Sequence, residues 1–369
     1  MQGVGWRTRW SIRWARWRRW EFWPGPLFYV PVVAYISART LLTGQLTRFT
    51  AVNPGISHAG GLIGEGKDET LVPLAARAAD FVAPFELVEA DLAPAERTAR
   101  ALAFAQRLGR PWPLVIKPNR GERGRGVRIA HSEGAVRDYF NRMHLPAIVQ
   151  AYAPGQEYGL FFVRRPGEPG GLVSITEKRF PKLRGDGRRT LGALILDDAR
   201  GRLISPLLFE RFSDSLDRVP GADETIPMAD VGSHCRGALF LDAKALDSEA
   251  LTARVRALAD AIPGFHFGRF DVRAQSADAL VRGEGFQVIE VNGASSEPAH
   301  VYHPGTPLLV GLRSFFGIWR DMMDIGAANA QAGAPWIRPF DLAAMAWREN
   351  GKLRGVDWPS NLWPGDRPR

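Results

Sequence analysis

The sequence contains a single cysteine, Cys235, in 369 residues. One cysteine cannot form a disulfide within the chain, and it cannot supply the several thiolates of a structural zinc or iron–sulfur site. The chain therefore needs no oxidising compartment in order to fold, which favours a reducing one. Nothing near Cys235 marks it as a thiolate, so we expect this side chain to be buried rather than catalytic.

Long uninterrupted apolar runs are also missing. The stretch at residues 22–36 reads FWPGPLFYVPVVAYI and is interrupted by Pro24, Gly25, Pro26 and Pro31. A helix needs about 20 consecutive apolar residues to cross a bilayer. We therefore expect a partly buried hairpin or an interfacial segment at this point, and no membrane-spanning helix elsewhere in the chain.

What is present is the composition of an ordinary globular protein, with 45% hydrophobic and 24% charged residues. The length allows a large core and favours two or three lobes. The net charge of +9 is unevenly placed, because residues 1–23 contain six arginines and one glutamate and so supply +5 of it. Since the excess is local, we do not expect the whole protein to bind nucleic acid.

The basic segment at residues 1–23 also holds six of the twelve tryptophans. On a helix, five of them fall in a stripe about 120° wide, flanked by arginines: Trp6, Trp10, Trp14, Trp17 and Trp20. Tryptophan favours the membrane–water interface and arginine is attracted to anionic headgroups, so the first interpretation is an amphipathic helix lying in the membrane plane. A helix that packs its tryptophans on the protein body, or one that stacks on nucleic acid bases, are the alternatives.

The rest of the chain predicts a mixture of strands and helices without an internal repeat. Strands are expected at residues 114–116, 127–130, 147–151, 156–163, 172–180, 265–272 and 286–291. Helices are expected from Ser132 to about 143, from Thr190 through 196, at 251–262 and 307–325, and from beyond Trp336 to about 348.

The region before these elements is less regular. Residues 68–108 are expected to be mostly helical, with Pro84 and Pro94 marking breaks. Residues 53–67 form a glycine-rich loop, which is either a plain surface loop or one that faces a substrate or phosphate. Its candidate polar contacts are His58, Glu65 and Lys67.

Acidic and amide side chains meet at the ends of the two strands at 265–272 and 286–291. Glu290 and Asn292 are two residues apart and so project to the same face, where Asp271 of the adjacent strand can join them. Three hard oxygen ligands suit Mg²⁺ or Mn²⁺ better than zinc. The alternative is a solvated strand edge that binds no metal. Arg269 and the Asn-Gly-Ala-Ser-Ser loop that follows Val291 favour the metal site over this alternative.

A glycine- and arginine-rich turn follows the strand at 114–116 in the sequence VIKPNRGERGRGV. Lys117 can reach a phosphate, and the backbone amides of the loop can fold over one. By itself such a turn is most often only a hairpin. It is not a Walker A loop, which would place Gly-Lys-Ser/Thr after four residues.

Two further segments have a similar character. In IVQAYAPGQEYGLFFV, a connector backbone able to pair with an adenine edge precedes Glu157, whose carboxylate can accept both hydroxyls of a ribose. In ITEKRFPKLRGDGRRTLGALI, Lys178 closes a strand and Gly185-Asp186-Gly187 begins a turn into a helix.

Taken in order, these features resemble the ATP-grasp superfamily, in particular its carboxylate–amine ligases. GRFDV followed by IEVN is similar to the magnesium-binding end of D-alanine–D-alanine ligase, and GDGRRTLGALI is similar to a segment of cyanophycin synthetase. The resemblance covers roughly residues 105–310. It implies an α+β ATP-grasp fold in which two α/β subdomains clasp ATP, here with a reduced N-terminal lobe and the basic Trp-rich helix.

The resemblance also implies roles for individual residues. Lys117 and Lys178 would contact the phosphates of ATP, Glu157 the ribose, and the backbone of Ala151, Tyr152 and Ala153 the adenine, while Gly121, Gly124 and Gly126 would belong to a mobile loop over the γ-phosphate. Asp271, Glu290 and Asn292 would hold two Mg²⁺ (or Mn²⁺) ions with Glu290 bridging, and Arg269 would stabilise the transition state, with Lys178 as the second catalytic cation.

The chain departs from the family at Gln150, where many members carry an acidic residue, and in its short N-terminal lobe. The expected division is an interfacial segment at 1–36, a substrate-side lobe at 37–110, the ATP-grasp domain at 111–328 and a C-terminal helix and tail at 329–369. His300 and His303 are the two histidines near the expected site, apart from the loop residue His58, and His131, His144, His234 and His266 are taken as mostly structural.

The implied activity joins a carboxylate to an amine through an acyl phosphate, at the expense of ATP. The basic helix places such a ligase on the cytoplasmic face of the membrane, with a lipid-linked or envelope-precursor substrate. The alternatives are an ATP-grasp kinase that transfers the γ-phosphoryl group to a small molecule or lipid, and a non-catalytic module that binds membrane or nucleic acid. An export signal is disfavoured, because ATP is absent outside the cell.

Overall fold

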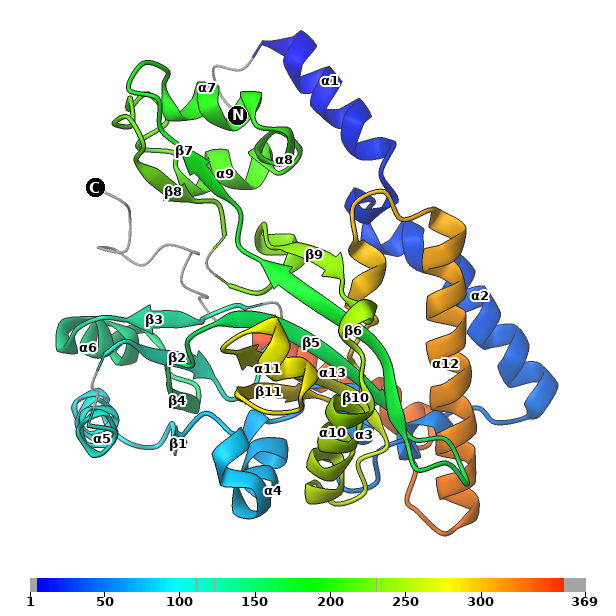
Figure 1. Ribbon diagram of the computed structural model, residues 1–369. Coiled ribbons are helices and arrows are strands. Elements are labelled where there is room, and N and C mark those ends of the chain that lie inside the picture. The colour runs from blue at the N-terminus through cyan, green and yellow to red at the C-terminus, as the bar shows by residue number, and fades with distance from the viewer. Residues whose placement is uncertain (1–4, 110–111, 122–123, 230, 355–369) are drawn as a thin grey trace.

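The structure is a computed structural model, and it describes residues 5–109, 112–121, 124–229 and 231–354, apart from the side chains of residues 58, 350 and 352–354. Its three sheets are antiparallel and helices flank them, so the predicted α+β class is confirmed. Figure 1 shows a four-stranded sheet on the left, a five-stranded sheet at the centre and a small third unit at the top. The predicted loop residues 122 and 123 and the tail beyond 354 lie outside the described residues.

The five-stranded sheet is the centre of the molecule. Its strands lie in the order β11 (Phe286–Asn292), β10 (Phe267–Ala274), β5 (Gln156–Val163), β6 (Gly171–Arg179) and β9 (Leu239–Asp242). One face packs its apolar side chains against α10 (Glu249–Ala261) and α4 (Lys67–Ala78). The opposite face is covered at one end by α12 (Leu308–Gln331), and its other end carries the polar side chains described below.

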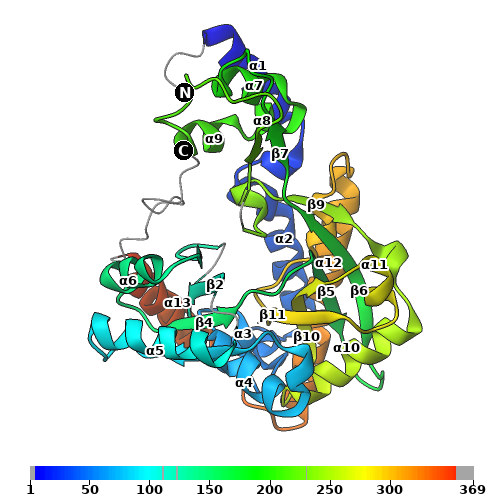
Figure 2. The same cartoon turned by 60° about the vertical axis from the view of Figure 1, so that its left-hand side comes forward.

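The four-stranded sheet has the order β1 (Phe85–Val88), β4 (Ala147–Ala151), β2 (Leu114–Pro118) and β3 (Arg128–Ala130). It packs with α5 (Pro94–Arg107) and α6 (Glu133–Arg142) around Phe104, Tyr139 and Phe140, and Figure 2 shows both helices on its outer side. Ser132 caps α6 as predicted, because its hydroxyl accepts the N–H of Ala135.

The third unit joins β7 (Lys182–Arg184) and β8 (Thr225–Pro227) to the short helices α7 (Leu191–Asp197), α8 (Ala199–Leu203) and α9 (Ser205–Arg211). Thr190 caps α7 as predicted, since its hydroxyl accepts the N–H of Ala193. Leu183, Leu208 and Ile226 are part of a small separate core within this unit.

The N-terminal helix α1 (Trp6–Trp17) leans on the third unit with the face opposite to its tryptophans. Ile12 of this face is buried, Arg16 donates to the carbonyl of Leu203 over 2.6 Å, and Arg202 donates to Ser11 over 2.8 Å. The alternative in which the whole tryptophan stripe packs on the body is therefore wrong for α1. Of the five tryptophans in the predicted stripe, Trp20 alone is buried, and it lies in η1 (Trp20–Phe22), after the end of α1.

The next segment is one continuous helix, α2 (Gly25–Thr43), where a partly buried hairpin or an interfacial segment was expected. Pro24 is its N-cap and Pro26 lies in its first turn, where proline is tolerated, so only Pro31 interrupts the helix interior. The helix packs on α12 through Phe28 and Val32, and Figures 1 and 2 both show the two helices side by side. By length and composition α2 is the one helix among the described residues that could cross a membrane, and only 11% of it is buried.

Two of the expected domain boundaries divide elements of the structure. The boundary at 36 falls inside α2, and the boundary at 110 separates β1 from β4, its partner in the same sheet. β1 was missed because it is only four residues long and follows Pro84 in a stretch that reads as helical. The remaining elements are η2 (Arg48–Ala51), α3 (Ser57–Gly61), η3 (Ala79–Phe81), η4 (His234–Arg236), η5 (Lys244–Leu246), α11 (Ala277–Val281), η6 (Ala299–Tyr302) and α13 (Pro339–Arg354).

Candidate active site

The candidate site lies on the polar end of the five-stranded sheet. Alternation along β10 directs Phe270 and Val272 into the apolar core and places Arg269, Asp271 and Arg273 on the opposite face. The strand pairing then brings partners to these residues from three other strands. Asp271 lies opposite Glu290 and Arg269 opposite Asn292 in β11, while Arg273 lies opposite Glu157 in β5, which in turn lies opposite Lys178 in β6.

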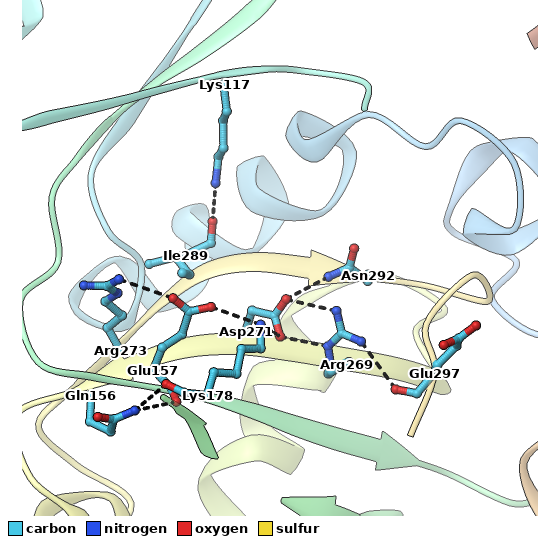
Figure 3. A network of polar contacts seen from close by, with 10 residues as sticks. All are labelled: Lys117, Gln156, Glu157, Lys178, Arg269, Asp271, Arg273, Ile289, Asn292 and Glu297. Atoms are coloured by element: carbon cyan, nitrogen blue, oxygen red, sulfur yellow. Dashed lines mark hydrogen bonds and ion pairs between the residues drawn. The ribbon is translucent and has the colours of Figure 1, made fainter. Parts of the chain in front are cut away.

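Asp271 is the centre of this network (Figure 3). Its carboxylate accepts two hydrogen bonds from Arg269 over 2.8 and 3.1 Å and one from the amide of Asn292 over 3.3 Å, and it lies 3.0 Å from the ammonium of Lys178. Burial by itself would raise the pKa of Asp271, but Arg269 and Lys178 outweigh it and lower the pKa to about 2. Asp271 is therefore an anion at every physiological pH.

Glu157 forms the second carboxylate centre of the same network. It lies 3.0 Å from Lys178 and 3.3 Å from Arg273, which also donates to the hydroxyl of Tyr152 over 2.9 Å. Burial opposes the charge of Lys178, yet Asp271 and Glu157 together raise the pKa of this lysine. Lys178 is thus a buried, fully charged group shared between two carboxylates.

Lys117 reaches from the four-stranded sheet to the five-stranded one. Its ammonium donates to the side chain of Gln150 over 3.0 Å and to the carbonyl of Ile289 over 2.7 Å. Because it is buried among neutral acceptors, its pKa falls to about 8, although Glu290 acts in the opposite direction. Gln150, the departure from the family pattern, therefore contacts a predicted phosphate-binding lysine directly.

The glycine-rich segment at 53–67 belongs to the site and is not a plain surface loop. Lys67 lies 3.5 Å from Glu290 and donates to the carbonyl of Gly121 over 3.2 Å. Both carboxylate oxygens of Glu65 accept the N–H of Gly293, over 3.0 and 3.2 Å. Burial raises the pKa of Glu65 to about 8, so this side chain holds a proton at neutral pH.

One cavity of about 530 Å³ joins all these groups. Of the predicted site residues it is lined by Lys117, Gly121, Gly124, Ala151, Tyr152, Ala153, Glu157, Lys178, Arg269, Asp271, Glu290 and Asn292. Gly126 does not line it. This glycine has φ +68° and a Cβ there would lie 2.8 Å from the ring of Pro118, so its role is to let the loop fold against β2.

The donor set at the end of β10 and β11 fits a hard divalent cation. Asp271 and Glu290 provide carboxylates and the Asn292 amide oxygen is a third hard donor, although Asp271 is already held by cations. Among the described residues no group of three or more His, Cys, Asp or Glu could hold a metal ion. The candidate metal site thus depends on the asparagine and on a phosphate oxygen or water to complete the coordination.

Several cavity residues were missed by the sequence analysis or assigned differently. Arg273 and Glu297 line the cavity and carry no motif signal. Cys235 is exposed and also lines the cavity, so the expectation of a buried cysteine was wrong. The reason is that it lies in η4, a loop turn beside the site, where Ser233 is its neighbour at 3.1 Å.

The histidines are also placed differently from the expectation. His300 and His303 do not line the cavity, whereas His234 does. The ring of His303 accepts the N–H of Asp242 over 3.0 Å. His234 stacks on Tyr302, with ring centroids 5.0 Å apart, and burial lowers its pKa to about 3, so it is neutral.

Comparison with known proteins gives structural neighbours only. No family model matches the chain, and no curated protein matches it. Similar solved structures include a bifunctional glutathione synthetase from Pasteurella multocida, which is 14% identical with a TM-score of 0.36. The match covers 68% of this chain and 36% of that one, so the chain spans about a third of its length.

Two D-alanine–D-alanine ligases are similar as well. The enzyme from Bacillus anthracis is 14% identical with a TM-score of 0.38, and the match covers 73% of this chain and 67% of that one. The enzyme from Coxiella burnetii is 12% identical with a TM-score of 0.40, and the match covers 79% and 62%. All three matches are distant, with TM-scores of 0.40 or below and identities of 14% or below.

Proposed function

We propose that the protein is an ATP-dependent ligase of the ATP-grasp type, which joins a carboxylate to an amine through an acyl-phosphate intermediate. The observation that carries this proposal is the concentration of positive charge in one cavity next to hard oxygen donors. Six cationic residues line it, on β2, the loop between β2 and β3, β6, β10 and the start of α4: Lys67, Lys117, Arg125, Lys178, Arg269 and Arg273. Such a cavity fits a triphosphate, because cations around the transferring phosphoryl group supply most of its catalysis.

The nucleotide would lie between the two sheets. Lys117 and Lys178 contact its phosphates, and a bound phosphate would favour the charged form of Lys117, whose pKa burial has lowered to about 8. The backbone of the connector after β4 meets the adenine, and Glu157 at the start of β5 accepts the ribose hydroxyls. In this arrangement the loop around Gly121 and Gly124 closes over the γ-phosphate and keeps water away from the acyl phosphate.

Mg²⁺ or Mn²⁺ would be held by Asp271, Glu290 and Asn292, whose oxygens are the hard donors that these ions prefer. When bound, these ions neutralise phosphate charge and orient the γ-phosphoryl group. Arg269 has its Nε–H and one amino group fixed by Asp271, and this fixed guanidinium faces the position of the transferring phosphoryl group. The substrate carboxylate attacks the γ-phosphorus and displaces ADP to give an acyl phosphate. The amine then attacks the acyl carbon, loses a proton and displaces phosphate to form the amide.

The protein would act on the inner face of the cytoplasmic membrane. Trp6, Trp10, Trp14 and Trp17 of α1 are 52–65% exposed, although tryptophan is rarely so open to water. Arginines flank this exposed row, and the opposite face of α1 is occupied by its contacts with the third unit. The combination fits a helix that lies in an anionic membrane surface and leaves the ligase body in the cytoplasm.

The proposal is tested by incubating the purified protein with Mg·ATP and a panel of amino acids and small carboxylic acids, with and without a membrane lipid extract. Phosphate release and product mass are measured together. The expected result is stimulated phosphate release with a new mass equal to acid plus amine minus water. A new mass carrying an added phosphoryl group, without free phosphate, would replace the ligase by a kinase. ATP binding without any turnover would reject both enzymatic functions.

A further inference from the structure

The end of the cavity beyond Arg269 has a chemistry that a nucleotide does not require. Three aromatic side chains, Trp23, Tyr29 and Tyr302, line it together with the carboxylate of Glu297. A second acidic residue of the lining, Glu21, already pairs with Arg200 over 3.3 Å. The hydroxyls of Tyr29, from α2, and Tyr302, from η6, both donate to this carboxylate, the latter over 2.8 Å. Arg269 donates over 3.3 Å to the backbone carbonyl of Glu297, so the backbone of this residue adjoins the proposed catalytic arginine (Figure 3).

The Glu297 carboxylate has neutral hydrogen-bond donors but lacks a cation. Within the described part of the chain, no lysine or arginine forms an ion pair with it, and Arg269 reaches only its backbone. The two tyrosine hydroxyls occupy two of its roughly four lone-pair sites, so the carboxylate can accept a further donor. Aromatic faces close to a carboxylate also favour an organic ammonium group.

Trp23 links this end of the cavity to the surface of α1. Its ring stacks on Trp17 with centroids 5.6 Å apart, and its indole N–H donates to the carbonyl of Trp17 over 2.6 Å. Trp17 belongs to the exposed row of α1 and also lines a second hollow of about 330 Å³. This α1 hollow is lined mainly by the aromatic and cationic side chains of Trp10, Arg13, Trp14, Arg16, Trp17 and Phe22.

We propose that the cavity end around Glu297 binds the amine substrate, and that this amine is carried by an amphiphile whose apolar chain lies in the α1 hollow. The ammonium group of this amphiphile pairs with the Glu297 carboxylate. The indole ring of Trp23 lies between that carboxylate and the hollow. The proposal rests on the ligase function above and gives the class of its acceptor. It also explains why the N-terminal segment, which lies outside both sheets, contributes Trp23 and Tyr29 to the cavity.

The test is a binding measurement on the full chain without nucleotide. Isothermal titration calorimetry is carried out with decylamine, ethylamine and decanol, all below the concentration at which decylamine forms micelles. Decylamine should bind at least about tenfold more tightly than either of the others, because it alone has both an ammonium group and a chain. Glu297→Gln should reduce decylamine binding to the level of decanol and leave decanol binding unchanged.

Two matched variants locate the chain and check the packing. Trp17→Ala should weaken binding of decylamine and decanol alike, whereas Trp6→Ala, which removes an exposed tryptophan of the same row outside the hollow, should change neither. Tyr29→Phe removes one hydroxyl but keeps the carboxylate, so it should retain the preference for decylamine over decanol. An equal loss in Tyr29→Phe and Glu297→Gln would assign the effect to packing and overturn the proposal, as would unchanged decylamine binding in Glu297→Gln.

The measurement is independent of catalysis. Failure of ATP-dependent amide formation together with Glu297-dependent decylamine binding would reject the ligase function and leave the amine site standing. Amide formation with a small water-soluble amine, and no preference for decylamine, would reject the amine site and leave the ligase function standing.

Discussion

Two regions of this protein reverse the usual distribution of side chains in opposite ways. On the five-stranded sheet, charged groups are buried: Glu157, Lys178 and Asp271 are each no more than 5% exposed. On α1, tryptophans are exposed, and Trp10 is 65% accessible. In ordinary globular proteins the first kind of residue lies on the surface and the second inside.

The comparison shows how differently the two reversals are stabilised. In the sheet each buried charge has opposite charges within 3.0 to 3.3 Å, contributed by neighbouring strands, so the desolvation cost is offset inside the protein. On α1 the tryptophan row is left open by the protein itself, and in the membrane proposal a lipid surface covers it. The sheet therefore supplies the counter-charges of its own buried groups, whereas α1 supplies no cover for its own tryptophans.

The largest expected effect is on catalysis by the sheet. Glu290→Gln should reduce turnover roughly 1000-fold, because about 4 kcal/mol of transition-state stabilisation is lost when a metal-binding carboxylate becomes an amide. The fold should be unaffected, since Glu290 is partly exposed and its ion pair with Lys67 is long at 3.5 Å. Phosphate release measures turnover, and circular dichroism measures whether the fold is kept. Glu284→Gln, an exposed carboxylate just before β11, should keep full activity, and full activity in Glu290→Gln would remove the metal assignment.

The second effect is on stability. Lys178→Met should lower the free energy of unfolding by about 3–5 kcal/mol, because it leaves the buried carboxylates of Glu157 and Asp271 without their shared cation. Arg179→Met, one residue further along β6, removes an exposed ion pair with Glu177 and should cost less than about 1 kcal/mol. Urea unfolding measures the free energy of unfolding of both variants. Equal losses would show that burial of the ion-pair network does not contribute to stability.

The third effect concerns α1. Changing Arg7, Arg9 and Arg13 to glutamine together should weaken binding to phosphatidylserine vesicles about a hundredfold at low salt, because each arginine near an anionic surface contributes roughly 1 kcal/mol. All three side chains are exposed, so stability and ATP turnover in solution should not change. Vesicle sedimentation is the measurement.

The control for this experiment is the same charge change made elsewhere. A second triple variant changes three exposed arginines of other elements to glutamine, at Arg137, Arg184 and Arg282. Its vesicle binding should stay within about twofold of the wild type, since these arginines lie outside the proposed interface. Equal weakening by both triple variants would reduce the membrane proposal to a general effect of net charge. High salt should release the wild type if α1 binds in the plane, and leave it bound if α2 spans the bilayer.

The smallest effect is the pH dependence that Glu65 introduces. Burial raises its pKa from 4.5 to about 8, so between these values the folded chain holds a proton that the unfolded chain has lost. This contribution to stability is complete below pH 4.5 and is lost as the pH rises to about 8, at no more than about 1.4 kcal/mol per pH unit. Urea unfolding from pH 5 to 8 should show the loss in the wild type and a flatter profile in Glu65→Gln. Parallel profiles would contradict the buried, protonated Glu65.

The parts of the site that the sequence predicted follow from local rules. Glu290 and Asn292 share a face because side chains alternate along a strand, and Asp271 joins them because its strand is adjacent in sequence to theirs. The helix caps at Ser132 and Thr190 are local in the same way. The strands at 147–151 and 156–163 were predicted with the bounds that the structure has, because their apolar runs lie between clear turn residues.

The parts that could not be predicted depend on contacts between distant segments. Glu65 binds the N–H of Gly293 across 228 residues, and Tyr29 donates to Glu297 across 268. No spacing rule relates such pairs, since their geometry exists only once the N-terminal segment has packed against the sheet. The same reason explains β1, whose four residues become a strand only by pairing with β4.

The sequence by itself determined the chemistry available to this protein: a basic row of tryptophans, a glycine loop behind a lysine, and acidic and amide ligands on one strand face. These depend on residue type and on the periods of helix and strand, which are local properties. The tertiary structure decided which groups share a cavity, which carboxylates receive a cation, and that Tyr29 of a segment outside both sheets meets Glu297. Burial and strand pairing set these, because a charge acquires its final partners and its pKa only when water has been removed around it.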